Sequence, residues 1–452
     1  MLRLNGLVQD KRKFADIAHA VIFPAPDAIV GSERKHARTY EGGLRYDRAL
    51  GPADDLELVG SYRSVTTVGI DRESTAWEYS VSDERSNASE AILRAALRHH
   101  RGGATIEIGA EGAVNSLDVR NALVEDGEPV PLPQANVRVA ERRAELFVTA
   151  SRPFGARTMA EFGVRYEISR LSQTGDIDLV KSFAFWKPRA RLVWAPAPNR
   201  TIRLLAERAV GQLDFGDFVG AASLTSGTIS AGNADLEPDS LWRVELSYER
   251  RFGAGSFTLA ARREWISDLV DQLPVVVDGV LYDAVGNIGA ARRDTVEASL
   301  KWPLDGFGAR GVVVTADFVA RRGRATDPAT GERRPISGDL PVEARVARAH
   351  DIPAWMLRWG GSYAFARTET AFKVEEIEAD HLAGRLDLFV EYRPDARWTL
   401  RLFGKNLTDS AATRTRDIYA GIRGDGALRY RELRVLRSGR YVGLTVQRSF
   451  GG

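Results

Sequence analysis

The chain contains no cysteine among its 452 residues. This absence excludes disulfide bonds, thiolate nucleophiles and cysteine-ligated metal sites. It also suits an exported protein, because an oxidising compartment can mispair free thiols. Many cytosolic proteins lack cysteine as well, so the absence leaves the compartment open.

The sequence also has no apolar run of about 18 residues, the length that a transmembrane helix needs. Its longest apolar stretches are short, as at residues 352–357. A membrane crossing would therefore have to use the strands of a β-barrel. The hydrophobic share of 44% and the mean hydropathy of -0.25 permit this, because a barrel turns only every second side chain to lipid.

Charge excess and catalytic motifs are missing too. Lys and Arg number 63 and Asp and Glu number 61, so there is no basic surplus that would favour nucleic acid as a partner. The six histidines show no HExxH spacing, and we interpret His99 and His100 as a strand-end or loop pair rather than as metal ligands. No GxSxG elbow or phosphate-binding loop is present. We therefore predict a protein that is not an enzyme and holds no metal or cofactor.

Alternation of apolar and polar residues with a period of two fills most of the chain. In residues 160–168, alternate positions from Ala160 to Ile168 are apolar, and Arg165 and Glu167 lie on the other face. Residues 242–249, 296–302 and 385–392 repeat the pattern. This period indicates β-strands with one apolar face, and no long helix competes with it.

The connections predict how these strands are arranged. Short Gly-, Pro- and Asp-rich segments at 50–54, 251–255 and 393–396 indicate tight hairpins, whereas 121–134, 214–239, 324–339 and 408–426 are longer and polar. Short turns at one end and long loops at the other are typical of outer-membrane barrels. We predict an all-β fold, a transmembrane antiparallel up-and-down β-barrel of about 20–22 strands. The alternative is a soluble all-β sandwich or propeller, which would fold in buffer without detergent.

Charged residues on the polar faces would line the lumen of such a barrel. They include Arg165, Glu167, Arg243, Glu245, Arg385, Asp387 and Glu391. We interpret them mainly as a ladder of cross-strand ion pairs, with ligand contacts as the alternative. Ligand recognition would then depend on the long loops, and no ligand-binding residue is assigned.

Three stretches carry a resemblance to a known family. Gly232, Asn233, Leu236 and Pro238 lie in a loop that leads into the alternating strand at 241–252. Asn406, Leu407 and Asp409 belong to an Asn-Leu-Thr-Asp segment, and a last alternating strand at 439–450 ends in the aromatic Phe450. Together these motifs resemble the C-terminal barrel domain of the TonB-dependent outer-membrane receptors.

The resemblance implies a place in the cell outer membrane and active uptake of a scarce solute such as a ferric siderophore, a cobalamin or a glycan fragment. Its implied partners are outer-membrane lipid, a small-molecule solute and, if a plug is supplied, the TonB complex. We expect residues 1–452 to form one barrel domain without a signal peptide or plug, because Met1–Gln9 already alternates. The chain would then be a fragment or partner of a plug-bearing protein. The alternative is a passive outer-membrane pore.

Overall fold

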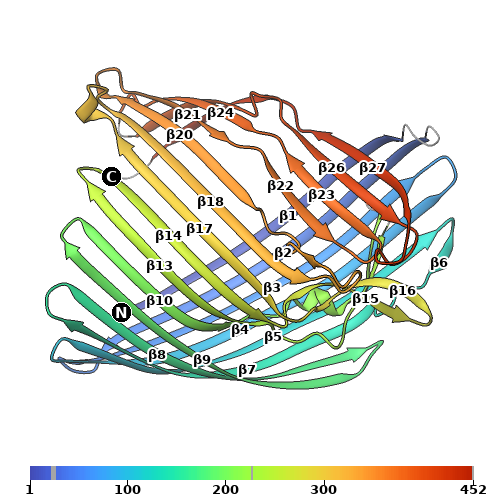
Figure 1. The fold of residues 1–452 in the computed structure, drawn as a ribbon, viewed down its shortest axis with the longest axis horizontal. Coiled ribbons are helices and arrows are strands. Elements are labelled where there is room, and N and C mark those ends of the chain that lie inside the picture. The colour runs from blue at the N-terminus through green and yellow to red at the C-terminus, as the bar shows by residue number, and fades with distance from the viewer. Residues whose placement is uncertain (22–26, 225–227, 396, 450–452) are drawn as a thin grey trace.

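The computed structural model describes residues 1–21, 27–224, 228–395 and 397–449. They form an antiparallel main sheet of 20 strands that curls into a barrel-shaped wall (Figure 1), and each of two smaller sheets has four strands. Antiparallel pairing satisfies the backbone hydrogen-bonding groups between neighbouring strands, as a wall that lies in lipid requires. The predicted all-β antiparallel architecture is confirmed, with 20 strands at the low end of the expected range.

The strands of the first half of the wall are long. They are β1 (Leu2–Val21), β2 (Asp27–Ala49), β3 (Asp54–Ser74), β4 (Tyr79–Arg101), β5 (Ala104–Glu125), the short β6 (Glu128–Val130), β7 (Asn136–Phe154), β8 (Thr158–Gly175), β9 (Leu179–Ala197) and β10 (Arg200–Val210).

The second half of the wall has shorter strands. They are β13 (Ser240–Phe252), β14 (Gly255–Ser267), β17 (Ala291–Pro303), β18 (Val312–Thr326), the two-residue β19 (Arg333–Arg334), β20 (Val342–Ile352), β21 (Leu357–Ala364), β24 (Arg385–Tyr392), β25 (Trp398–Lys405) and β28 (Tyr441–Arg448).

The smaller sheets are built from the long connections. One contains β11 (Ala221–Ser223), β12 (Thr228–Ala231), β15 (Val270–Val277) and β16 (Val280–Asn287), next to a 3-10 turn, η1 (Phe215–Phe218). The other contains β22 (Arg367–Phe372), β23 (Glu376–Leu382), β26 (Ala411–Tyr419) and β27 (Leu428–Arg437). Both lie at one end of the wall, on the right in Figure 1. The polar segments expected to be loops therefore carry sheet structure of their own.

The opposite end of the wall carries mostly tight turns, for example at 50–53, 102–103 and 253–254. Both termini lie there, because the amide of Asp47 donates to Met1 O at 2.9 Å and the amide of Ser449 donates to Arg397 O at 2.8 Å. The contrast between the ends is incomplete, since the connections 75–78 and 176–178 at the far end are also short. We call the far end the loop end.

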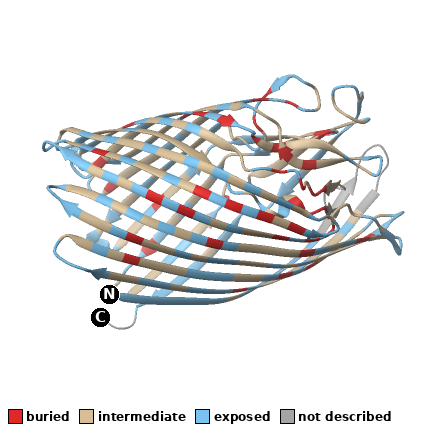
Figure 2. Cartoon of the chain, turned by 90° about the horizontal axis from the view of Figure 1, so that it is seen from below, coloured by how far each residue is buried: buried red, intermediate tan, exposed pale blue. Residues whose placement is uncertain are grey.

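The two faces of the wall differ as the alternation predicts. On β7 and β8, Leu146 and Phe162 point outward and are 64% and 62% exposed, whereas Glu145 and Glu167 on the inner face are buried. Figure 2 shows the resulting change between buried and exposed positions along the strands. Apolar side chains that remain exposed over many strands form the surface that lipid would cover.

A compact apolar core lies inside the wall at the loop end. Val139 of β7 and Leu171 of β8 face inward and pack against Phe218 and Leu236 of the connection between β10 and β13. All four are at most 1% exposed. This connection therefore folds back onto the inner face instead of extending into solvent.

Two strands border the wall. Within the described residues, β1 pairs only with β2 and β28 pairs only with β25. Because neighbouring strands alternate in direction throughout, and two of the 20 strands are only the short β6 and β19, β1 and β28 run antiparallel to each other.

The outward orientation of Val296, which is 43% exposed on β17, gives a direct test. We expect Val296→Arg to lower the free energy of unfolding from lipid vesicles by about 2–4 kcal/mol, because it places a cation against hydrocarbon. Ser299→Arg on the same strand is the matched control, because Ser299 faces the lumen and donates a hydrogen bond to Asp317 at 3.1 Å. Equal destabilisation by both variants in urea titrations would contradict the assignment of the two faces.

Candidate functional site: the inner wall and the loop end

The inner wall carries networks of ion pairs. On β2 to β5, the carboxylate of Glu57 accepts from Arg45 at 2.6 Å and from Arg94 at 3.0 Å. Arg94 and Arg98 also donate to Glu107, at 2.8 and 2.6 Å. Glu57 is only 4% exposed, so its charge is held by the guanidinium groups around it rather than by water.

The same arrangement continues on β7 to β9 with two of the residues that the sequence placed in the lumen. Arg165 donates to Glu145 at 2.7 Å, and Lys187 donates to Glu167 at 2.8 Å and also pairs with Glu145. The ring of Phe147 lies between these pairs and the first network, with the Cζ atoms of Arg94 and Arg165 at 4.8 and 5.1 Å from its centroid. These cation–π contacts join two ion-pair networks.

The other lumen-facing residues that the sequence nominated are paired as well. Arg243 bonds Glu207 and Glu264 at 3.0 and 2.7 Å, and Glu245 lies 3.6 Å from Arg262. Arg385 bonds Asp387 at 3.2 Å, and Glu391 pairs with Arg393. Arg165, Glu167, Arg243 and Glu245 thus pair across strands, as the interpretation of a cross-strand ladder requires. The contacts of Arg385 with Asp387 and of Glu391 with Arg393 instead join residues two apart in the sequence.

Glycines opposite phenylalanines recur on the inner face. Gly109 lies opposite Phe147, Gly360 opposite Phe389 and Gly443 opposite Phe403. A Cβ atom at Gly109 would come within 2.5 Å of Ala95 O and 2.3 Å of the Phe147 ring. The missing side chain thus lets the aromatic ring lie flat on the wall.

The first motif predicted from the sequence holds a loop-end connection in place. The Asn233 amide side chain donates from Nδ2 to Val285 O at 2.9 Å, and its Oδ1 accepts from the amide of Asp235 at 2.9 Å. A Cβ atom at Gly232 would lie 2.3 Å from Phe218 O, so glycine permits the backbones to approach. The motif therefore fastens η1 and β16 together.

Leu236 and Pro238 belong to the same anchor. Leu236 is fully buried in the inner core, and its carbonyl oxygen accepts from Lys181 Nζ at 3.4 Å. Pro238, half-buried, precedes β13 by two residues. The structure brings together the four residues of the first motif, Gly232, Asn233, Leu236 and Pro238. Their contacts hold the connection against the inner wall and do not form an open binding site.

The second motif forms a junction between strands. Asn406 is 4% exposed and has a φ of 52°. Its amide donates to Asp387 Oδ1 at 2.9 Å, and its Nδ2 donates to Gly439 O at 3.0 Å. Its Oδ1 accepts from the amide of Ser410 at 2.8 Å. Asn406 thus links the loop ends of β24, β25, β26 and β28.

The neighbours of Asn406 complete this junction. The amide of Leu407 donates to Leu386 O at 2.8 Å, and the amide of Asp409, whose φ is also 52°, donates to Asn406 O at 2.9 Å. Phe450, the last residue of the third motif, lies outside the described residues.

A buried ion cluster that was not predicted from the sequence lies at the loop end, and we call it the loop cluster. It contains Asp271, Asp327, Arg334 and Arg423, with side chains at most 5% exposed. Arg334 bonds Asp271 at 3.0 Å and Asp327 at 3.1 Å, and Arg423 bonds Asp327 at 2.7 Å. The ring of Phe372 lies 4.8 Å from the Arg334 Cζ atom.

The loop cluster joins separate connections of the chain. Asp271 lies on β15, Asp327 follows β18, Arg334 is on β19 and Arg423 lies between β26 and β27. A second link runs from the amide of Val374 to Asp283 Oδ1 of β16 at 2.6 Å. Because two cations meet two anions, the cluster is neutral while it ties both smaller sheets to the wall.

The paired histidines lie on opposite faces of β4. His99 Nδ1 is 2.8 Å from Asp54 Oδ1, and His100 Nε2 is 3.2 Å from Asp55 Oδ2. Consecutive strand residues point apart, so the two rings cannot share one metal ion. Over the described ranges, no group of three or more His, Asp or Glu side chains is placed to hold a metal. No helix there is long and apolar enough to cross a membrane.

Comparison with known proteins supports the family resemblance. Residues 23–407 match the profile of the family described as TonB dependent receptor-like, beta-barrel. Searching the curated proteins gives no sequence match.

Solved structures of similar fold include the siderophore receptor PiuA from Acinetobacter baumannii, at 11% identity and a TM-score of 0.65, covering 98% of this chain and 74% of that one. The copper transporter OprC has 12% identity and a TM-score of 0.62, covering 100% and 83%. The ferric citrate transporter FecA in its unliganded form has 11% identity and a TM-score of 0.63, covering 98% and 70%. At these identities the likeness shows a shared fold.

The buried junction at Asn406 predicts a large effect of truncation. We expect Asn406→Ala to lower the free energy of unfolding by about 2–4 kcal/mol, since buried partners lose hydrogen bonds and alanine disfavours positive φ. Asn406→Gly, which removes the side chain but accepts that φ, should recover about 1 kcal/mol of this loss. Denaturant titration measures both, and an alanine variant as stable as the parent would contradict the assigned role.

The η1 turn should respond to pH through Asp217. Burial and the nearby charge of Asp214 raise the pKa of Asp217 from 3.8 to about 6. The folded turn binds this proton more tightly than the unfolded chain does, so its stability falls as pH rises from 3.8 to about 6. We expect amide exchange at 215–219, after correction for intrinsic rates, to become faster across that window. Asp217→Asn should remove the dependence, and a pH-dependent asparagine variant would contradict it.

Proposed function

Because the chain belongs to the TonB-dependent receptor-like β-barrel family, a family of outer-membrane transporters rather than enzymes, we propose that it forms the wall of a receptor for active uptake of a scarce solute. We favour a ferric siderophore as the class of solute. The family match over residues 23–407 is the observation that carries this proposal. Structural relatives described as a siderophore receptor and a ferric citrate transporter support the solute class.

The loop end would recognise the solute. The loop cluster and the Asn233 anchor hold the connections over this end of the wall, whereas the charged inner-wall residues already satisfy one another. Preorganised polar connections lose less entropy when they bind than free loops do. We therefore place solute recognition on these connections.

We further propose that the wall works with a plug domain, as a fragment or partner of a plug-bearing protein. TonB would then act on that plug. The single-sided pairing of β1 and β28 supports a need for more polypeptide, because free strand edges in lipid leave backbone groups unsatisfied. An even number of added strands would complete an antiparallel barrel between these edges.

Uptake assays test this proposal. The chain is expressed in a receptor-deficient bacterium, alone and with a plug-bearing partner, and offered radiolabelled ferric catecholate, ferric citrate or cupric ion. We expect TonB-dependent accumulation of the ferric catecholate only in the presence of the partner. Arg334→Met should reduce uptake without altering insertion, because it leaves the buried Asp271 without a cation and Asp327 with Arg423 alone.

Arg165→Met is the control for Arg334→Met, because Arg165 lies on the inner wall away from the loop end. We expect it to leave uptake unchanged. TonB-dependent transport by the chain unaided would contradict the need for a plug. A steady, wide conductance in planar bilayers, with no accumulation against a gradient, would favour the passive pore instead.

A further inference from the structure

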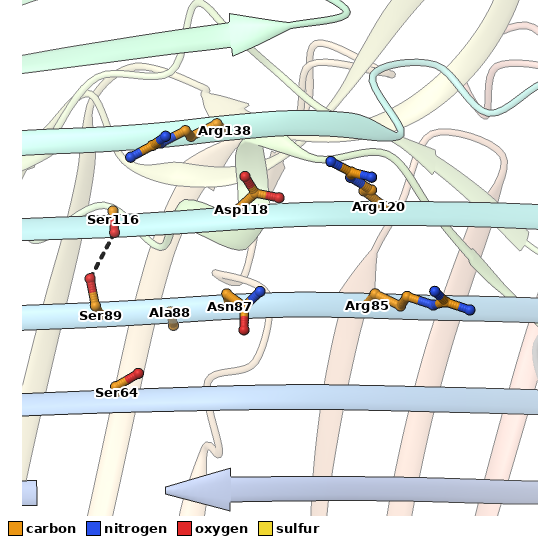
Figure 3. Close-up of a pocket in the computed structure, with 9 residues that line it drawn as sticks. All are labelled: Ser64, Arg85, Asn87, Ala88, Ser89, Ser116, Asp118, Arg120 and Arg138. Atoms are coloured by element: carbon orange, nitrogen blue, oxygen red, sulfur yellow. Dashed lines mark hydrogen bonds between the residues drawn. The ribbon is translucent and has the colours of Figure 1, made fainter. Parts of the chain in front are cut away.

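A polar cavity of about 480 Å³ opens where β3, β4, β5 and β7 run side by side (Figure 3). Its lining includes Arg85 and Asn87 of β4, Asp118 and Arg120 of β5, and Arg138 of β7. Figure 3 shows these side chains on neighbouring strands, where Arg138 is the cross-strand neighbour of Asp118. Neither the ion-pair ladder nor the loop end includes them.

The cavity lies on the outer face of the wall. β4 pairs with both neighbours without a register shift, so Arg85 and Asn87 share a face with Leu93, which is 65% exposed. The opposite face of β4 carries Arg94 and Arg98, which bind Glu57 inside the wall. The lining arginines therefore point away from the lumen.

These outward arginines differ from the inward ones in their partners. Within the described part of the chain, Arg120 and Arg138 make no ion pair, although Asp118 lies two residues before Arg120 on β5 and is the cross-strand neighbour of Arg138 on β7. Arg85 bonds only Asp83, at 3.2 Å, and its side chain is 70% exposed. The cavity thus presents three cations against one lining carboxylate, whereas the inner arginines are neutralised by glutamates.

An apolar groove continues from the cavity on the same strands. Its outward lining includes Ala91 and Leu93 of β4, Gly112 and Val114 of β5, and Arg142 of β7, around about 400 Å³. A Cβ atom at Gly112 would meet nothing closer than 4.0 Å, so the floor of the groove is open.

The boundary between cavity and groove coincides with the edge of the outward apolar band. Ser89 and Ser116 lie on it, joined by a hydrogen bond of 2.8 Å. Next to this boundary, the outward residues of β4 and β5 are apolar toward the tight turns and polar toward the loop end, while Arg142 of β7 lies opposite Val114 on the apolar side. In an outer-membrane barrel the loop end faces outside the cell, so this boundary lies at the headgroups of the outer leaflet.

We propose that the cavity and groove together bind a phosphorylated lipid of the outer leaflet. Its phosphate lies between Arg85, Arg120 and Arg138, and one acyl chain lies along Leu93 and Gly112. A guanidinium group can donate two parallel hydrogen bonds to the oxygens of one phosphate. Loss of water at the lipid interface strengthens these hydrogen bonds. The groove distinguishes a lipid from a free anion, because only an amphiphile fills both halves of the site.

Native mass spectrometry of the full chain in neutral detergent micelles tests the proposal. The probes are dioleoyl phosphatidate, uncharged dioleoylglycerol and inorganic phosphate. We expect phosphatidate to bind and dioleoylglycerol to bind at least tenfold more weakly. Arg120→Ala with Arg138→Ala should weaken phosphatidate binding about thirtyfold, since removal of one basic residue at an anionic headgroup raises the dissociation constant about fivefold and the two factors multiply.

The matched control removes two other outward arginines, Arg322→Ala with Arg324→Ala on β18, which share a face with Phe318. Phosphatidate affinity should then stay within about twofold. Equal weakening by both double variants would overturn the proposal, because it would indicate general attraction to the charged surface.

A second variant tests the groove independently. Gly112→Leu fills the open floor and should weaken phosphatidate while leaving any inorganic phosphate affinity unchanged. Phosphatidate affinity unchanged in this variant, together with equally tight binding of inorganic phosphate, would show a free-anion site and overturn the lipid proposal. The result of the lipid-binding experiment does not depend on solute uptake, because no residue of the cavity belongs to the loop cluster.

Discussion

The structure depends on an antiparallel hydrogen-bond ladder, with a register shift beside Arg200, in which each strand turns alternate residues to opposite surroundings. From β1 to β28 the pairing holds a register that keeps apolar side chains outside and charged ones inside. A slip of one residue would place Arg165 in lipid and Phe162 in the lumen. The ion pairs follow from this constraint, because each inward charge has to find its partner on a neighbouring strand.

The inward charges form networks rather than isolated pairs. Glu57 pairs with three arginines, and the ring of Phe147 lies between this network and the one that contains Arg165. At the loop end, Phe218 and Leu236 insert against the inner wall, and the two smaller sheets are joined by the loop cluster. Ion pairs thus stabilise both the wall and its connections, and apolar burial is added at the loop end.

The fold could be predicted from the sequence because a period of two is a local property, visible within residues 160–168. The motifs at Gly232 and Asn406 were also visible, but their contacts were not: Asn233 bonds Val285, 52 residues away, and Asn406 bonds Gly439, 33 residues away. Asp271, Arg334 and Arg423 lie in connections without periodicity, where partners depend on how the loops fold. Strand length is the one feature that points to the outer cavity. β4 and β5 have 23 and 22 residues, about twice the number that a strand needs to cross a bilayer.

The loop cluster has a mechanical consequence. Asp327 shares its carboxylate between Arg334 and Arg423, and Arg334 also pairs with Asp271, so loss of Arg334 leaves the buried Asp271 without a cation. Connections far apart in the sequence are therefore coupled through one shared carboxylate. A force applied at the turn between β26 and β27 acts on Asp327 through Arg423 and on Asp271 of β15 through Arg334.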